Sequence, residues 1–291
     1  MSTRFTVLVP AHDEEAVIGR LLAALAPPSG RETEIDVIVL CNACADNSAD
    51  VAREAMPAAR IVEISHPGKA NAINQGLKLA NGGPVFVVDA DIVVGFHTLE
   101  CLADILRDGS IMVVSPMARI DTSRSSGAVR AYYRIWQLLP YLRSGVGGSG
   151  VYGLSQKAAM QINPLPLIIA DDSYVRRSFH AAELARITTS RDGQPVFTTV
   201  FAPANLPALI RVEARRRAGD AQLAQFQLVQ PSGTGISLFN LPRQLDATAS
   251  WLDLFVYMTV KFAGRVLYRI NRLLGRADIW WRDDSSRKSL G

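Results

Sequence analysis

The chain has 291 residues, of which 48% are hydrophobic and 20% charged, with a formal net charge of +4. This length suits one large domain or one and a half, and the charge is too small to predict a nucleic-acid partner. No apolar tract preceded by positive charge opens the sequence, so we expect no secretory signal. The three cysteines form no disulfide framework, which fits a reducing cytoplasm.

Strands and helices are predicted to alternate over the first 120 residues. Apolar runs predict strands at 5–10, 36–40, 60–65, 85–89 and 111–116, and helical spacing predicts helices at 14–25, 47–55, 70–80 and 97–107. This alternation is typical of an α/β protein, in which helices flank a Rossmann-like, mainly parallel sheet. After Pro116 we expect a helix at 125–142, a glycine-rich segment at 145–153 and a short helix after Asp171.

The fourth predicted strand ends in two carboxylates, because residues 85–91 read Val-Phe-Val-Val-Asp-Ala-Asp. A fully apolar run is typical of a strand buried on both faces of a parallel sheet. Open α/β sheets bind ligands at the carboxyl ends of their strands, so Asp89 and Asp91 are expected at a ligand site. Two such acids suit a divalent cation that carries substrate phosphates. The alternative is a pair of loop-capping acids.

Two common nucleotide-binding motifs are missing: G-x-G-x-x-G after the first strand and G-x-x-x-x-G-K-[ST]. Four other motifs stand at strand or helix boundaries: Pro-Ala-His-Asp-Glu-Glu (10–15), Cys-Asn-Ala-Cys-Ala-Asp (41–46), Gly-Lys-Ala-Asn-Ala-Ile-Asn (68–74) and Asp-Ala-Asp (89–91). In this order and spacing they resemble the inverting family 2 glycosyltransferases with the GT-A fold, over roughly residues 4–220. The resemblance implies a catalytic domain at 1–220, with a nucleotide-binding half (1–120) and an acceptor-side half (121–220), followed by a helical extension at 221–291.

The resemblance also implies residues that bind the nucleoside. Backbone groups of Pro10 and Ala11 would frame it, and Glu14 would accept hydrogen bonds from the base or ribose. Asp13 stands where the family usually has asparagine. Asn42 would read a pyrimidine edge, because an amide offers both a donor and an acceptor. For Glu14 the alternative is a favourable acid in a first helical turn.

The diphosphate end of the donor is assigned in the same way. Lys69 would place a positive charge near the base or diphosphate, and the alternative is a solvated surface lysine. Asp89 would hold the ribose or metal-bound water, and Asp91 would ligate the Mg²⁺ or Mn²⁺ ion that bridges the phosphates. Asp46, at the end of the second motif, is expected mainly as a helix cap.

The catalytic base is expected in the second half of the chain. Residues 168–172 read Ile-Ile-Ala-Asp-Asp, another apolar run that ends in two acids before a helix. The resemblance implies that Asp172 deprotonates the acceptor hydroxyl and that Asp171 orients the acceptor, although the family usually has Glu-Asp here. Neighbouring carboxylates disfavour each other's ionised form, which tunes one toward general-base duty. Capping of the helix is the alternative for both.

Four further features stay open. The Gly-Gly-Ser-Gly segment at 147–150 lets the backbone approach the donor sugar or acceptor, or is a flexible loop. The arginines at 215–217 lie where processive relatives have Q-x-x-R-W, and either neutralise the leaving diphosphate or form a solvated basic face. His180 completes the cation site or, more simply, lines a helix. The C-x-x-C of Cys41 and Cys44 has no second pair and no nearby histidine, so we expect neither metal nor redox use.

The C-terminal segment carries a basic stripe beside an apolar side. Charges interrupt residues 251–275 too often for a membrane-spanning helix. A basic amphipathic helix followed by Trp280 and Trp281 suits an anionic membrane surface. Packing on the catalytic domain or on a twin subunit is the alternative, which we slightly favour. The stripe consists of Lys261, Arg265, Arg269, Arg272 and Arg276.

These features together predict a metal-dependent inverting glycosyltransferase of the cytoplasm, with a role in cell-envelope or polysaccharide synthesis. The expected donor is a nucleotide-diphosphate sugar, with UDP-sugars favoured by the family's majority, and the acceptor is a carbohydrate, a small molecule or a lipid-linked molecule. A peripheral contact with the inner face of the membrane and a homodimer through the C-terminal helix are both open. One alternative is a sugar-1-phosphate nucleotidylyltransferase, whose G-x-G-T-R-like loop is missing here. The other is a non-catalytic nucleotide-sugar-binding protein, which would lack a base or metal ligand.

Overall fold

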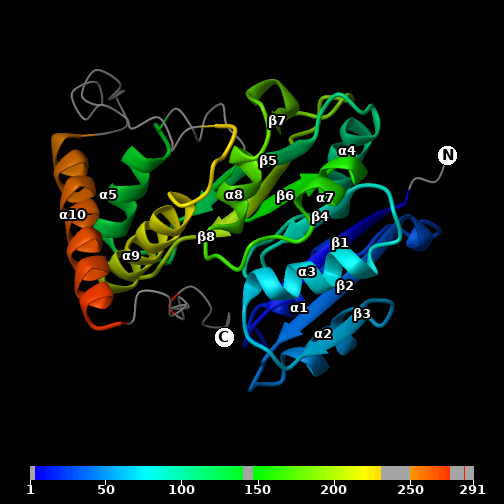
Figure 1. Cartoon of the computed structure of the whole chain (residues 1–291), viewed down its shortest axis with the longest axis horizontal. Coiled ribbons are helices and arrows are strands. Elements are labelled where there is room, and N and C mark those ends of the chain that lie inside the picture. The colour runs from blue at the N-terminus through cyan, green and yellow to red at the C-terminus, as the bar shows by residue number, and fades with distance from the viewer. Residues whose placement is uncertain (1–3, 140–146, 231–249, 276–284, 286–291) are drawn as a thin grey trace.

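Strands and helices alternate through the N-terminal half of the computed structural model (Figure 1). The structure describes residues 4–139, 147–230, 250–275 and 285. Every strand and helix predicted for this half is present, with bounds close to those expected. The elements are β1 (Phe5–Ala11), α1 (Ile18–Leu25), the 3₁₀ helix η1 (Glu32–Glu34), β2 (Ile35–Asn42), α2 (Ser48–Ala55), β3 (Arg60–Ile64), α3 (Lys69–Leu79), β4 (Val85–Val88), α4 (Phe96–Arg107) and β5 (Val113–Asp121).

Two of these elements depart from their predicted bounds for local reasons. The first helix is predicted from residue 14, but α1 begins at Ile18 because a turn precedes it, in which the amide of Val17 donates to the carbonyl of Glu14 at 3.0 Å. β5 continues past Pro116 because residues 117–121 pair with β8 (Phe197–Phe201). Pairing with a distant strand is not visible in a local pattern.

The second half mixes strands and helices less regularly. Of the helix predicted at 125–142, residues 127–136 form α5, and residues 140–142 lie outside the described residues. The short helix after Asp171 is confirmed as α8. β6, α7, β7, β8 and α9 are not predicted by the sequence patterns. The elements are α5 (Gly127–Trp136), β6 (Val151–Leu154), α7 (Gln156–Ile162), α8 (Asp171–Arg177), the 3₁₀ helix η2 (Ala181–Glu183), β7 (Leu184–Ile187), β8 (Phe197–Phe201), α9 (Leu206–Leu223) and α10 (Trp251–Leu273).

The strands form one eight-stranded sheet in the order β3-β2-β1-β4-β6-β5-β7, with β8 paired to β5. The first four strands are parallel, and β6 runs antiparallel between β4 and β5. Gly153 lets β6 enter the sheet here, because a Cβ at this position would lie 2.4 Å from the Phe86 ring. The mainly parallel sheet predicted from the sequence is confirmed.

Helices cover both faces of the sheet. Alternate residues of a strand point to opposite faces, so Val7 and Val9 of β1 face an apolar layer with α1 and α4. Leu8, between them, faces a second layer with α3, α7 and α8. Because parallel strands packed in this way all end at one edge, the predicted motifs converge there.

A third apolar cluster joins α5, α9 and α10, which lie together at one end of the molecule (Figure 1). The rings of Tyr132 and Tyr257 stack with centroids 5.0 Å apart. Beside them the carboxylate of Glu213, only 1% exposed, accepts from Tyr132 Oη (2.7 Å), Arg216 Nη1 (2.6 Å) and Lys261 Nζ (2.6 Å). Lys261 belongs to the predicted basic stripe, but its ammonium group contacts this buried carboxylate and is not available to a membrane surface.

The C-terminal helix α10 packs with one face and exposes the other. Asp253, Tyr257, Val260 and Gly264 are buried against α5 and α9, so packing on the rest of the chain, the alternative that we favoured, is found. Arg276, Trp280 and Trp281 lie outside the described residues. The outward apolar side chains are 38–88% exposed: Trp251, Leu252, Phe255, Phe262, Val266, Ile270, Leu273 and Leu274.

The division of the chain after residue 220 stays a prediction. α9 (Leu206–Leu223) runs through this position and packs on α10, so the two predicted parts share a helix pair. In the described ranges, no helix has both the length and the apolar character that crossing a bilayer requires.

Candidate functional site

Predicted site residues from three motifs meet at the carboxyl edge of the sheet. Pro10 and Ala11 end β1, Asn42 ends β2, and Asp89 directly follows β4. These strands are parallel neighbours, with β1 in the middle. The pattern of apolar runs that end in polar residues therefore correctly predicted that these residues lie at the same edge of the sheet.

The loops after β1 and β2 are hydrogen-bonded to each other. Asp13 Oδ1 accepts from the amide of Ala45 at 2.6 Å, and the amide of Glu14 donates to Ser48 Oγ at 2.6 Å. Asp13 has a φ of 54°, in the left-handed region that asparagine and aspartate tolerate better than most residues. This conformation explains how Asp13 replaces the asparagine that the family usually has at this position.

Asp46 stabilises the start of α2 from the position before the N-cap, which is Asn47 and not, as predicted, Asp46. Its Oδ1 accepts from the amide of Ser48 at 2.9 Å. Asp13, Cys44 and Asp46 also lie close enough together to hold a metal ion. Because both carboxylates already accept hydrogen bonds from backbone amides, we assign this group to the fixing of the two loops.

Asn42 has a buried acceptor without a partner. The residue is 4% exposed, and its Oδ1 has no hydrogen-bond partner in the described part of the chain. Leaving such a group unsatisfied costs about 1–3 kcal/mol, so its presence calls for an explanation. A ligand N–H at this position would satisfy it. Glu14, 6% exposed, is a further buried polar residue of this edge.

Lys69 connects the two halves of the site. It is the first residue of α3, and its Nζ lies 2.7 Å from Asp89 Oδ1 and 3.0 Å from Asp171 Oδ1. Burial by itself lowers the pKa of Lys69, but Asp171 and Asp89 outweigh that effect and raise the pKa above its ordinary value. The side chain is 16% exposed, so it is not a solvated surface lysine.

Asp171 is enclosed, whereas Asp172 is partly open. Tyr152 Oη donates to Asp171 Oδ2 at 3.1 Å, and the Asp171 side chain is 3% exposed. Burial raises the pKa of the Asp171 carboxyl group, and Lys69 offsets part of this rise. Asp172 is half-buried, and its Oδ1 accepts from the amide of Ser173 at 2.7 Å. Of these two neighbouring acids, Asp172 is therefore the more accessible.

Tyr152 and Arg20 are site residues that the sequence patterns missed. Tyr152 lies on β6, and its only signal was its place at the end of the glycine-rich segment. Burial first, and then the charge of Asp171, raise the pKa of Tyr152 and keep it a donor. Arg20 Nη2 donates to the carbonyl of Asp91 at 3.2 Å, and its guanidinium carbon lies 3.9 Å from the centroid of the Phe201 ring. Nothing in the helical pattern of α1 marks this arginine.

The glycine-rich segment reaches Asp89. The amide of Asp89 donates to the carbonyl of Gly150 at 2.9 Å. Gly150 has a φ of +68°, and a Cβ there would lie 2.7 Å from Ile92 Cγ2, so no other residue fits without strain. The segment thus brings backbone next to the predicted donor site. Contact of this backbone with the sugar stays a prediction.

The remaining candidates have different surroundings. Arg216 pairs with Glu213, whereas Arg217 lines a pocket between α9 and α10. His180 is exposed, and its side chain caps η2 together with Glu183. Cys41 and Cys44 are free thiols. None of these observations assigns a role in the transfer of sugar.

Comparisons with known proteins agree with this picture. The family model described as glycosyl transferase family 2 matches residues 6–161. A probable glycosyltransferase of Bacillus subtilis (strain 168), YdaM, is 30% identical over 95 residues, which are 30% of this chain and only 23% of YdaM. A mannosyltransferase of Pyrobaculum calidifontis, PcManGT, solved with GDP-Man and Mn²⁺, has the same fold, with a TM-score of 0.59 and 20% identity over 94% of this chain and 84% of that one. The chain therefore belongs to glycosyl transferase family 2 and has the predicted GT-A fold.

Proposed function

We propose that this glycosyltransferase moves a sugar from a nucleotide-diphosphate donor to an acceptor hydroxyl, with inversion at the anomeric carbon and with a divalent cation as cofactor. The observation that carries the proposal is the contact of Lys69 with both Asp89 and Asp171. It joins the end of β4, on the donor side, to the start of α8, where the base Asp172 lies. A donor and an acceptor bound at these two places would meet at Lys69.

The nucleoside is proposed to bind at the ends of β1 and β2. The buried Oδ1 of Asn42 needs a donor, and the N–H of uracil between two carbonyl groups suits an amide that both accepts and donates. Pro10 and Ala11 would frame the base, and Glu14 would accept from the ribose. We therefore favour a UDP-sugar. A GDP-sugar is the alternative, since the similar Pyrobaculum enzyme was solved with GDP-Man.

The cation is proposed to bind at Asp91, with Asp89 beside it. Both carboxylates offer hard oxygen ligands at the sheet edge, and Asp91 is half-buried. The two residues therefore fit an Mg²⁺ or Mn²⁺ ion that is held by one or two carboxylates and by the phosphates of the substrate. Asp89 already contacts Lys69, so Asp91 is the stronger ligand candidate. When bound, a cation of this kind stabilises negative charge on a diphosphate. The Mn²⁺ of the similar Pyrobaculum structure supports this choice.

Asp172 is proposed to act as the general base. Its carboxylate takes the proton of the acceptor hydroxyl while that oxygen forms a bond to the anomeric carbon. The bond from this carbon to the diphosphate oxygen breaks on the opposite side, and the diphosphate leaves with the electron pair. Asp171, enclosed by Lys69 and Tyr152, positions the start of α8 and does not itself meet the acceptor.

The test is the anomeric configuration of the product. A panel of UDP- and GDP-sugars is first screened with Mn²⁺ for thermal stabilisation, because a true donor raises the melting temperature by mass action. Proton NMR of the product formed from the best donor should show the configuration opposite to that of the donor. Retention of configuration would rule out the mechanism. Release of pyrophosphate from a nucleoside triphosphate and a sugar 1-phosphate would instead identify a nucleotidylyltransferase.

The cellular setting is proposed from the sequence. A cytoplasmic location, a cell-envelope role, a homodimer and a peripheral membrane contact all stay predictions from the sequence. The exposed apolar face of α10 is compatible with either of the last two.

A further inference from the structure

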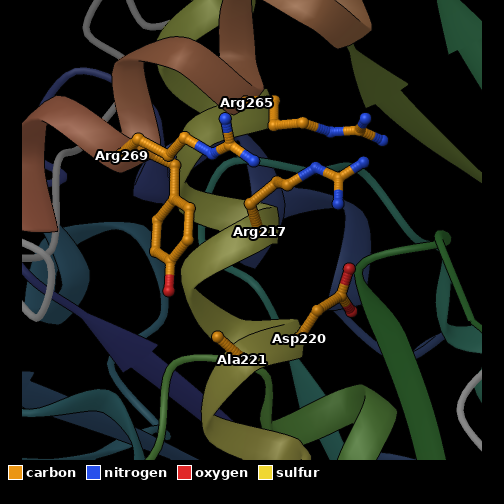
Figure 2. Close-up of a pocket in the computed structure, with 6 residues that line it drawn as sticks. Arg217, Asp220, Ala221, Arg265 and Arg269 are labelled. Atoms are coloured by element: carbon orange, nitrogen blue, oxygen red, sulfur yellow. The ribbon is translucent and has the colours of Figure 1, made fainter.

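α9 and α10 form an open pocket that the proposed mechanism does not use. It has a volume of about 420 Å³. Arg217 and Asp220 come from α9, and Arg265 and Arg269 come from α10. Figure 2 shows the guanidinium groups of the three arginines gathered in the same space, with Asp220 beyond Arg217. The lining is completed by Ala221 and Tyr268.

The pocket has an excess of positive charge. Three arginines face a single carboxylate, that of Asp220. Within the described ranges, neither Arg265 nor Arg269 forms an ion pair, whereas Lys261, which precedes them on α10, contacts Glu213. Like charges held together repel, and an anion removes that cost. Guanidinium groups present a planar fork of donors that matches the oxygens of a phosphate.

Helix α9, which lines the pocket, packs against the segment that leads into the predicted base. Gly219, which precedes Asp220, lies against Ala170, the residue before α8. A Cβ added to Gly219 would lie only 2.7 Å from Ala170 Cβ. Gln222 Oε1 accepts from the amide of Ile169 at 2.8 Å. Burial raises the pKa of Asp220, whereas Lys261 and Arg217 lower it and the charges of Glu213 and Asp172 raise it. The helix that forms one wall of the pocket therefore packs directly against the residues that lead into Asp172.

The arginines also border the exposed apolar face of α10. Residues three or four apart lie on neighbouring positions of a helix surface, so Phe262 and Val266 adjoin Arg265 and Arg269. Phe262 is 67% exposed and Val266 38%. A phosphate in the pocket leaves an attached apolar chain free to lie along this face.

We infer that the pocket binds the phosphate group of the sugar acceptor, so that the acceptor is a phosphate ester that presents a hydroxyl to Asp172. This inference rests on the proposed function and deepens it. Two sources share this chemistry: a lipid with a phosphate head group and a small phosphorylated molecule. The exposed apolar face favours the lipid.

The experiment compares two double variants of the full chain that lose the same charge from the same pair of helices. Arg265→Gln with Arg269→Gln removes two arginines of the pocket. Arg211→Gln with Arg272→Gln is the control, because these residues lie on α9 and α10 but do not line the pocket. Binding of inorganic phosphate is measured by calorimetry, and binding to phosphatidylcholine vesicles with and without phosphatidic acid by sedimentation. Mn²⁺-dependent UDP binding is measured in parallel.

We expect the pocket variant to bind the phosphate probes about ten-fold more weakly, the loss expected for one charge-assisted hydrogen bond or more, and the control to bind like the wild type. UDP binding should be unchanged in both. Preference for phosphatidic acid vesicles, lost in Phe262→Ser, identifies a lipid acceptor. Binding of free phosphate without a preference for vesicles identifies a small acceptor. Either result supports the inference.

Three results would overturn the inference. Equal weakening in both double variants would show diffuse charge attraction instead of a site. Weakened UDP binding in the pocket variant, with competition between UDP and phosphate, would place the pocket in the donor site. A wild-type chain that binds UDP with Mn²⁺ but neither phosphate probe would leave the proposed function standing without the acceptor pocket. Absence of Mn²⁺-dependent nucleotide binding, by contrast, would count against the proposed function itself.

Discussion

Lys69 Nζ lies 3.0 Å from Oδ1 of Asp171, and the two residues are 16% and 3% exposed at the side chain. A buried ion pair loses much of its hydration, so removing one partner leaves the other charge without compensation. Here the pair also fixes where α8 starts relative to α3. The position of Asp172, the next residue along the chain, depends on it.

Lys69→Met should therefore lower the free energy of unfolding by about 3 kcal/mol, since Asp171 remains buried without its cation. It should also reduce turnover, because α8 loses its anchor. Urea unfolding and steady-state kinetics measure the two effects. The matched control is Lys78→Met, near the other end of the same helix, which should change neither. Equal effects of the two variants would mean that the ion pair contributes nothing specific.

Asp172→Asn should separate catalysis from folding. Because Asp172 is half-buried and proposed as the base, its loss should cut turnover by about two to four orders of magnitude and leave donor affinity and stability nearly unchanged. Asp171→Asn should behave differently. The neutral amide no longer compensates Lys69, so stability as well as turnover should fall. Turnover that holds in Asp172→Asn while donor affinity falls would reverse the assignment of the base.

Asp91→Asn should abolish metal-dependent nucleotide binding, because it replaces a charged oxygen ligand by an amide of the same shape. Titration of UDP with and without Mn²⁺ measures the effect. Asp46→Asn is the matched control, because Asp46 belongs to the other group of residues that is able to hold a metal. It should keep the metal dependence and change stability little, because the side-chain oxygen of asparagine still accepts from the amide of Ser48. The reverse outcome would move the cation to the loops after β1 and β2.

The sequence predicted well which candidate residues lie at the carboxyl edge of the sheet, because each strand and helix there is locally encoded. An apolar run followed at once by Asp89 is enough to place this carboxylate at the end of a buried strand. Lys69 was marked by its motif at a helix start. The sequence patterns did not show that Lys69 contacts Asp171, which lies 102 residues later in the sequence.

The acceptor side was harder to predict because it is built from long-range contacts. Tyr152 donates to Asp171 from an antiparallel strand inside a glycine-rich segment that carries no clear strand pattern. Lys261 belongs by spacing to a basic stripe, yet it pairs with Glu213, 48 residues away. Helical periodicity tells which residues share a face, but not which buried group lies opposite that face.

Glu213 gives the chain a specific response to acid. Burial by itself raises its pKa, but Arg216 and Lys261 outweigh burial and lower the pKa to about 2. In the unfolded chain Glu213 has the ordinary pKa of a glutamate, which is higher than its pKa in the folded protein. At pH values above this ordinary pKa, the ionised Glu213 therefore stabilises the folded state. The contribution is lost as the pH falls toward about 2, where the folded carboxylate takes up its proton.

The free energy of unfolding of the wild type should therefore fall between about pH 5 and pH 2, by up to about 3 kcal/mol from this group. Glu213→Gln should be less stable at pH 7, because it removes the negative charge that joins α9 to α10 through Lys261. It should also lose less stability across the acid range, since the titrating group is gone.

Urea unfolding at several pH values measures how the free energy of unfolding changes with pH in the wild type and in the variant. Glu54→Gln, an exposed glutamate of α2, is the control and should follow the wild type. A variant at position 213 that loses stability in parallel with the wild type would show that other carboxylates set the acid response.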